Sequence, residues 1–138
     1  MFNLFRRQKE PIPFPDNQAA FAHACTLGYQ PLIGALIPAL VLETGGFGPE
    51  GERTFQINLA VDGVGRAVWS STLKDAKGFP KEGDFVGFRI VMIASDLPEH
   101  ANLIGYLACR LEPVLVPGKG WRTAQVYTPD NLKPALRF

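Results

Sequence analysis

The segment Arg53–Trp69 constrains the fold more than any other part of this chain. Along its first half, apolar side chains alternate with smaller or polar ones, at Phe55, Ile57, Leu59 and Val61. This period of two predicts a strand that is buried on one face. Asp62-Gly63 follows at once, and Asp-Gly favours the backbone angles of a tight hairpin turn. We therefore expect the chain to reverse there and to form a second strand over residues 66–73.

Four further segments have strand-like apolar patterns and are bounded by turn-forming residues: Leu32–Glu43, Asp84–Ala94, Leu103–Val116 and Trp121–Tyr127. The last two are joined by Pro117-Gly-Lys-Gly120, which predicts a second hairpin. Proline cannot donate to a sheet, so Pro38 predicts a bulge or a sheet edge in the first of them. No crossover helix separates the strands, and we expect an antiparallel sheet.

One helix is predicted, over residues 16–28. Asp16 is a suitable N-cap and Gly28 a suitable C-terminal stop. Between them Phe21, Ala24 and Cys25 form a narrow apolar stripe at i, i+3 and i+4. This stripe must be buried against another element.

The predicted fold class is therefore mainly β: a small antiparallel β-barrel of about six strands with one short N-terminal α-helix. The chain of 138 residues forms a single domain, 1–138. Within it we expect an extended arm at 1–15, the helix at 16–28, the barrel at 32–127 and a C-terminal tail at 128–138. The architecture resembles an OB-like barrel, although OB folds place their helix between the third and fourth strands, whereas here the helix comes first.

The strand at Phe85–Ala94 is apolar on both faces. Val86, Phe88, Ile90, Met92 and Ala94 share one face, and Phe85, Val91 and Ile93 share the other with Gly87 and Arg89. Antiparallel sheets usually leave one face polar, so this strand must be covered twice. The barrel interior is one cover. The other is either the 16–28 helix, which requires fewer assumptions, or another subunit.

Composition and motifs argue against several functions. A net charge of +1 gives no overall attraction to a polyanion. The amino-terminal sequence does not have the form of a signal peptide, and no apolar run approaches the roughly 20 residues of a transmembrane helix. A cytoplasmic protein is the expectation. Cys25 and Cys109 lie in apolar surroundings and are interpreted as buried free thiols.

Catalytic and cofactor motifs are weak. The two histidines, His23 and His100, do not belong to a nucleophile motif, and an enzyme is not expected. His23 and Cys25 would lie about 200° apart around a helix, which argues against a shared metal site with His100 and Cys109. The glycine-rich segments 45–48 and 62–65 are not followed by a phosphate-binding Gly-Lys-Ser/Thr motif. We therefore expect no metal and no cofactor.

Candidate ligand-binding residues are aromatic and cationic side chains placed on predicted strands: Arg66, Trp69, Arg89, Tyr106, Arg110, Trp121 and Arg122. Arg89 stands out as a lone cation in an apolar strand, and buried charges need partners. Its structural interpretation is an ion pair with Glu112, and its functional interpretation is an anion-binding group. Tyr106 and Arg110 are predicted to share the polar face of their strand and to extend such a site.

These patterns lead to two functional hypotheses. The first is a non-catalytic binding or protein-interaction module, with a protein partner and self-association both left open. The alternative is a single-stranded nucleic-acid-binding protein that combines Trp69 and Trp121 with neighbouring cations, because small barrels bind single strands by stacking and charge.

Overall fold

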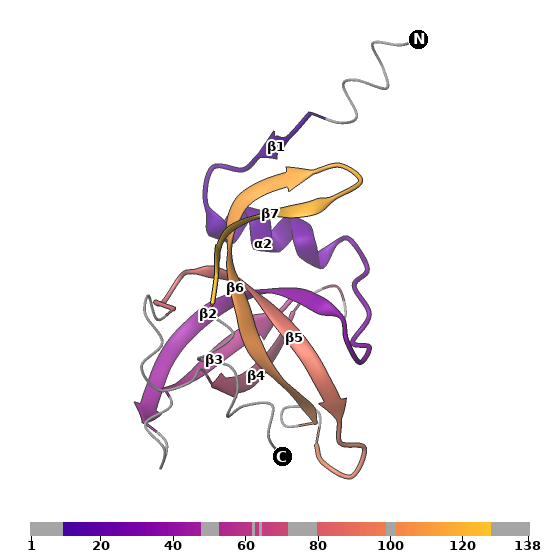
Figure 1. The fold of residues 1–138 in the computed structure, drawn as a ribbon, viewed down its shortest axis with the longest axis vertical. Helices are drawn as coiled ribbons and strands as arrows, with labels where there is room; N and C mark the ends of the chain where they lie inside the picture. The colour runs from indigo at the N-terminus through magenta and orange to yellow at the C-terminus, as the bar shows by residue number, and fades with distance from the viewer. Residues whose placement is uncertain are drawn as a thin grey trace.

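The fold is seen in a computed structural model that describes residues 10–47, 53–61, 63, 65–71, 80–98 and 102–127, apart from the side chains of 46, 47, 53 and 69–71 (Figure 1). In these residues one helix accompanies seven strands: β1 (Ile12–Pro13), α2 (Asn17–Cys25), β2 (Leu36–Phe47), β3 (Arg53–Leu59), β4 (Arg66–Ser71), β5 (Phe85–Ile93), β6 (Leu103–Val116) and β7 (Gly120–Val126). The mainly β class and both predicted hairpins are confirmed. The predicted tail, 128–138, and His100 lie outside the described residues.

All strand pairs are antiparallel, in the order β1-β6-β5-β2-β3-β4, and β7 also pairs with β6. The seventh strand is the short β1, within the predicted extended arm. The sheet curls until Cα atoms of β4 come within 8 Å of those of β6. The described part of the ladder does not join these two strands, so the sheet is not closed and the predicted barrel is not confirmed.

β2 is a central strand, contrary to the expectation of an edge or bulge at Pro38. It pairs with β5 on one side and β3 on the other, and Pro38 lies opposite Gly87. The register with β3 begins only at Ala39, and Pro38 contacts that side through its carbonyl, which accepts from the Ala60 amide at 2.9 Å. Proline is tolerated at this position because its nitrogen, which carries no hydrogen, points toward β3 where the pairing of β2 with β3 has already ended.

The main core fills the concave side of the curled sheet. The alternating residues of β3 are fully buried there, with Phe55, Ile57 and Leu59 each 0% exposed. Residues of β2, β4, β5 and β6 complete this cluster: Ile37, Ala39, Val41, Val68, Val86, Phe88, Ile90, Leu103 and Leu107. The period-two pattern therefore predicted the buried face of β3 correctly.

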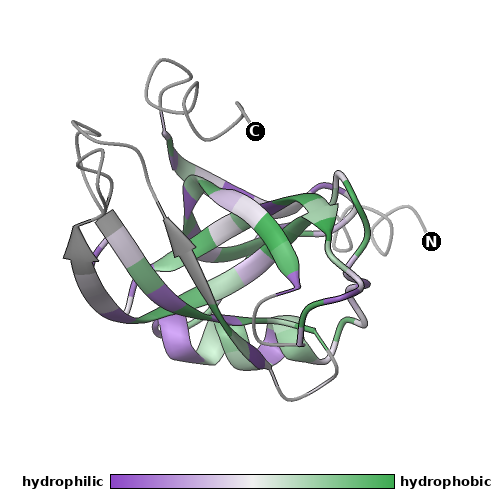
Figure 2. Cartoon of the chain, turned by 90° about the horizontal axis from the view of Figure 1, so that it is seen from below, coloured by the Kyte–Doolittle hydropathy of each residue, from purple (hydrophilic) through white to green (hydrophobic). Residues whose placement is uncertain are grey.

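A second layer covers the outside of the sheet. In Figure 2, α2 lies against the convex side of the strands. Its buried residues pack with outward-facing residues of the strands, and with Ala60 just after β3, into one cluster: Ala20, Phe21, Ala24, Cys25, Leu40, Ala60, Phe85, Cys109 and Leu111. The outer face of β5 is thus covered by the helix at Phe85, which is the simpler of the two covers expected from the sequence.

Two hydrogen bonds fix the start of α2. The Asp16 carboxylate accepts from the Ala19 amide at 2.8 Å, so the predicted N-cap is confirmed. The Asn17 side-chain amide donates to the Gly83 carbonyl at 3.0 Å, which ties the helix to the turn before β5. The helix ends at Cys25, earlier than the predicted end at residue 28, and Thr26 serves as its C-cap.

The helix does not reach the far end of β5. A bulge between Ile90 and Met92 leaves Val91 without a partner on β6. The extra residue reverses the alternation of faces, so Met92 does not follow Ile90 into the core and is 42% exposed. The prediction that Met92 shares the buried face is wrong for this reason.

Candidate functional site

The convex face of the central strands is covered by α2 at one end and is increasingly exposed toward the other end. Moving along β5, Phe85 lies beneath α2, and Gly87 follows opposite Pro38 on β2 and Cys109 on β6. Arg89 comes next, opposite Leu36 and Tyr106. Directly opposite residues project from the same face, so this last row sits at the border between the covered and the open part.

Trp121 closes the middle of this face. It is the second residue of β7, just after the turn, and it meets Phe85 edge-on, with ring centroids 5.0 Å apart. Phe14 and His23 pack around the same indole at centroid distances of 5.5 and 6.4 Å. The indole N–H donates to the Tyr29 hydroxyl at 3.0 Å. Trp121 is therefore held in one orientation by aromatic packing and a hydrogen bond.

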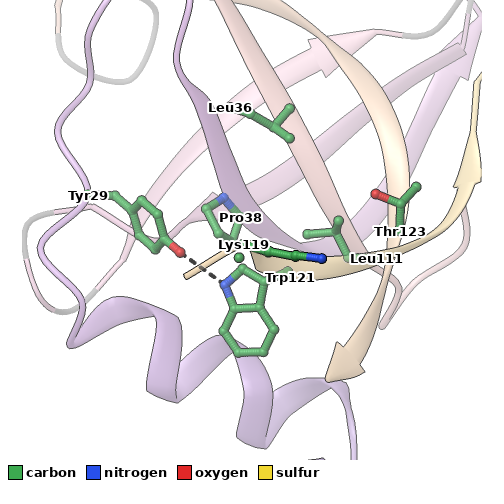
Figure 3. Close-up of a pocket in the computed structure, with 8 residues that line it drawn as sticks. Tyr29, Leu36, Pro38, Leu111, Lys119, Trp121 and Thr123 are labelled. Carbon is green, nitrogen blue, oxygen red and sulfur yellow. Dashed lines mark hydrogen bonds between the residues drawn. The ribbon is translucent and has the colours of Figure 1, made fainter. Parts of the chain in front are cut away.

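A recess of about 190 Å³ opens beside this indole (Figure 3). We call it the Trp121 recess and define it by the residues that line it: Tyr29, Leu36, Pro38, Leu111, Lys119, Gly120, Trp121 and Thr123. They come from the segment after α2, from β2, from β6 and from the β6–β7 hairpin. Figure 3 shows the Tyr29–Trp121 hydrogen bond on one side and Leu111 and Thr123 on the other.

The lining combines an apolar base with polar groups. Leu36, Pro38 and Leu111 provide carbon surface. The charged and polar side-chain groups are the Lys119 ammonium and the hydroxyls of Tyr29 and Thr123. Burial raises the pKa of the Tyr29 hydroxyl, and the hydrogen bond from Trp121 offsets this only in part, so the hydroxyl keeps its proton at neutral pH.

The turn of the β6–β7 hairpin presents Lys119. Gly118 and Gly120 on either side have φ angles of 81° and 97°, which suit glycine and disfavour other residues. The Lys119 amide donates to the Val116 carbonyl at 2.9 Å and closes the turn. The exposed Lys119 side chain runs over the recess, with its nitrogen directed toward the side of Leu111 and Thr123 (Figure 3).

Arg89 does not form the predicted ion pair with Glu112. Its Nη1 donates to the Gly34 carbonyl at 2.9 Å. Glu112 lies six positions beyond Tyr106, the residue opposite Arg89, which is about 20 Å along a strand. The half-buried guanidinium is instead held by a backbone oxygen. Burial raises the pKa of the nearby Cys109 thiol, and the positive charge of Arg89 is among the effects that oppose this rise.

Tyr106 and Arg110 do not share a face, contrary to the prediction. Gly87 pairs with Cys109 but Phe88 pairs with Leu107, so Ala108 is an extra residue in β6. Tyr106 therefore lies on the convex face with Arg89, while Arg110 lies opposite Val86, whose side chain belongs to the main core. This bulge separates the two residues.

The remaining predicted site residues lie elsewhere. Arg66 is opposite Leu59 at the start of β4 and Trp69 is opposite Gln56 on the same strand, with its side chain outside the described structure. Arg122 is exposed on β7 between two recess residues, so it points to the opposite face. Of the seven candidates, the structure thus places Trp121 in the recess, and Arg89 and Tyr106 in the row that borders it.

Seven of the eight residues that line the recess were not identified as site residues from the sequence, among them Tyr29, Lys119 and Thr123, which supply its hydroxyls and its ammonium group. Lys119 had a local signal, because a cation between two turn glycines is displayed at a hairpin tip. Tyr29 and Thr123 had none. The Tyr29–Trp121 bond joins residues separated by 92 positions, and no periodic pattern relates them.

Other reactive groups of the described residues are buried or dispersed. Cys25 and Cys109 are buried free thiols, as predicted, and burial raises the pKa of both. Within the described ranges, no three potential metal ligands of the His, Cys, Asp and Glu types come together. No helix among these residues is long and apolar enough to cross a bilayer.

Comparison with known proteins does not add an assignment. No protein-family model, curated protein sequence or solved structure matches this chain.

Proposed function

We propose that this protein is a non-catalytic binding module and that the Trp121 recess is the binding site for a small group of its ligand. The observation that carries the proposal is the construction of the recess. The segment after α2, β2, β6 and the β6–β7 hairpin all contribute to it, and the Tyr29–Trp121 hydrogen bond together with the Phe85 contact holds its wall in place. Such preorganisation reduces the entropy that a ligand must lose on binding.

The size of the recess limits what it accepts. Sites for cofactors and drug-sized ligands measure roughly 300–1,000 Å³. A dry apolar cavity of about 150 Å³ accepts benzene. At about 190 Å³, the Trp121 recess suits a group of benzene-like size.

The nucleic-acid alternative receives less support from Trp121. Base stacking needs an aromatic face that is open to the nucleotide. Phe14, His23 and Phe85 already pack around this indole. We therefore favour the binding module over single-strand recognition.

Filling the recess is expected to abolish binding of small probes. Isovalerate and isovaleramide, titrated separately into ¹⁵N-labelled protein, should shift the amide resonances of Leu111, Gly120 and Trp121. Weak affinities, with Kd on the order of 1 mM, are expected for ligands this small. Thr123→Phe places an aromatic ring in the recess from an exposed strand position that tolerates it, and the shifts should disappear.

Arg122→Phe is the matched control, because it adds the same ring to the other face of β7. This variant should retain the shifts of the wild-type protein. If neither probe shifts these resonances in the wild type, or if Thr123→Phe leaves the shifts intact, the recess is not a ligand-binding site.

A further inference from the structure

The charge of the recess specifies its ligand further. Resting on the function proposed above, we propose that the group bound in the Trp121 recess is a small organic carboxylate, with its carbon skeleton on the apolar base and its oxygens facing Lys119 and the two hydroxyls.

The lining is one-sided in its chemistry. Its only charged side chain is Lys119, and it contains no acidic residue. An anion is therefore attracted to this recess, whereas a cation finds no carboxylate to pair with. Because Lys119 is exposed, the attraction is moderate and decreases with salt.

The two hydroxyls add hydrogen-bond donors. The Tyr29 oxygen accepts from the Trp121 indole, which leaves its own proton to be donated. The Thr123 hydroxyl also carries one proton. A carboxylate is an acceptor at both oxygens, so it can use the ammonium and both hydroxyl protons. A neutral amide has one acceptor oxygen and also donors that the side chains of the recess match poorly.

Arg89 adds a second positive charge at the open border. It lies directly opposite Leu36, which lines the recess, and both residues project from the convex face. Its influence on the Cys109 pKa indicates that its field acts on this face of the sheet. Since its Nη1 donates a hydrogen bond to the Gly34 carbonyl, we assign Arg89 a role in the electrostatic field of the recess rather than in direct contact with the ligand.

The apolar base selects the rest of the ligand. Leu36, Pro38 and Leu111 offer no side-chain hydrogen-bond partner to a polar skeleton. Burying hydroxyls or amines there would leave them unpaired, and that is costly. A short branched or cyclic hydrocarbon stem matches both this surface and the volume of the recess.

Three probes of nearly the same shape test the proposal: isovalerate, isovaleramide and isoamylamine, which are anionic, neutral and cationic at neutral pH. Amide shifts of ¹⁵N-labelled protein give Kd for each. Isovalerate is expected to bind about two- to fivefold more tightly than isovaleramide, and isoamylamine most weakly. Lys119→Met keeps most of the side-chain length without the charge, and it should remove the advantage of isovalerate. Arg122→Met lowers the net charge equally on the other face of β7 and should preserve that advantage.

The outcomes separate the two proposals. Equal affinity for isovalerate and isovaleramide, or a preference for isovalerate that survives in Lys119→Met, would overturn the carboxylate assignment. The recess would still be a binding site in either case. Absence of shifts with all three probes would overturn the binding function itself.

Discussion

Gly105→Ala is expected to lower the free energy of unfolding by more than about 3 kcal/mol, or to prevent folding. A Cβ at this position would collide with the Arg89 carbonyl oxygen on the neighbouring strand and would come within 2.9 Å of Phe88 Cζ. The obstacle is backbone, which cannot move aside as a flexible side chain would. Relief requires separating β5 from β6 at the point where Gly105 pairs with Ile90.

Urea unfolding followed by circular dichroism measures this effect. Gly28→Ala serves as the control, because nothing lies within 4 Å of the Cβ that it adds, and its φ angle of 74° alone is strained. Gly28→Ala should lower the free energy of unfolding by only about 1 kcal/mol. If the two variants lost similar amounts of unfolding free energy, the backbones of β5 and β6 would not be in close contact at Gly105.

The second large effect is expected for Phe85→Ala, which should destabilise the protein by about 3–5 kcal/mol. Phe85 is 0% exposed and lies in the second layer between the sheet, α2 and Trp121. Truncating its ring leaves a cavity beneath the helix and also removes the edge-on support of the indole. Probe binding at the Trp121 recess should therefore weaken in the fraction that remains folded.

Ile93→Ala is the matched control on the same strand. Ile93 is 37% exposed and, beyond the bulge, lies opposite Leu103 on the concave face rather than beneath α2, so its truncation should lower the free energy of unfolding by about 1 kcal/mol and leave probe binding unchanged. Unfolding curves and isovalerate titrations of both variants provide the comparison. Equal destabilisation by the two substitutions would mean that the second layer contributes little.

Local patterns predicted the strands well, because alternation and turn chemistry are properties of neighbouring residues. Phe55, Ile57 and Leu59 face the core as their spacing indicates. The apolar residue Phe85 on the outer face of β5 correctly indicated a second layer. Whether a helix or another chain supplies that layer depends on tertiary packing, which a single-strand pattern does not contain.

Bulges limited the prediction of faces. Ala108 in β6 and Val91 in β5 each insert one residue into a ladder, and neither interrupts the apolar pattern of its strand. Each insertion exchanges the two faces beyond it. This is why Arg110 was wrongly grouped with Tyr106, and Met92 with Ile90.

The recess itself was beyond the reach of sequence patterns. Trp121 was identified as a candidate because it is an aromatic residue beside a cation on a predicted strand, but its partner Tyr29 comes from the other end of the described chain. The recess is created by the curl of the sheet and by the hairpin that folds over it. Individually, Leu36, Leu111 and Thr123 are ordinary strand residues.

The central claim is that Trp121 is fixed on the outer face of β5, where it forms the wall of the recess. Nuclear Overhauser effects between the Phe85 ring protons and the Trp121 indole protons test it directly. The edge-on contact at a centroid distance of 5.0 Å predicts strong cross-peaks between these two side chains. Their absence in a spectrum in which both rings are assigned would contradict the second layer and, with it, the recess.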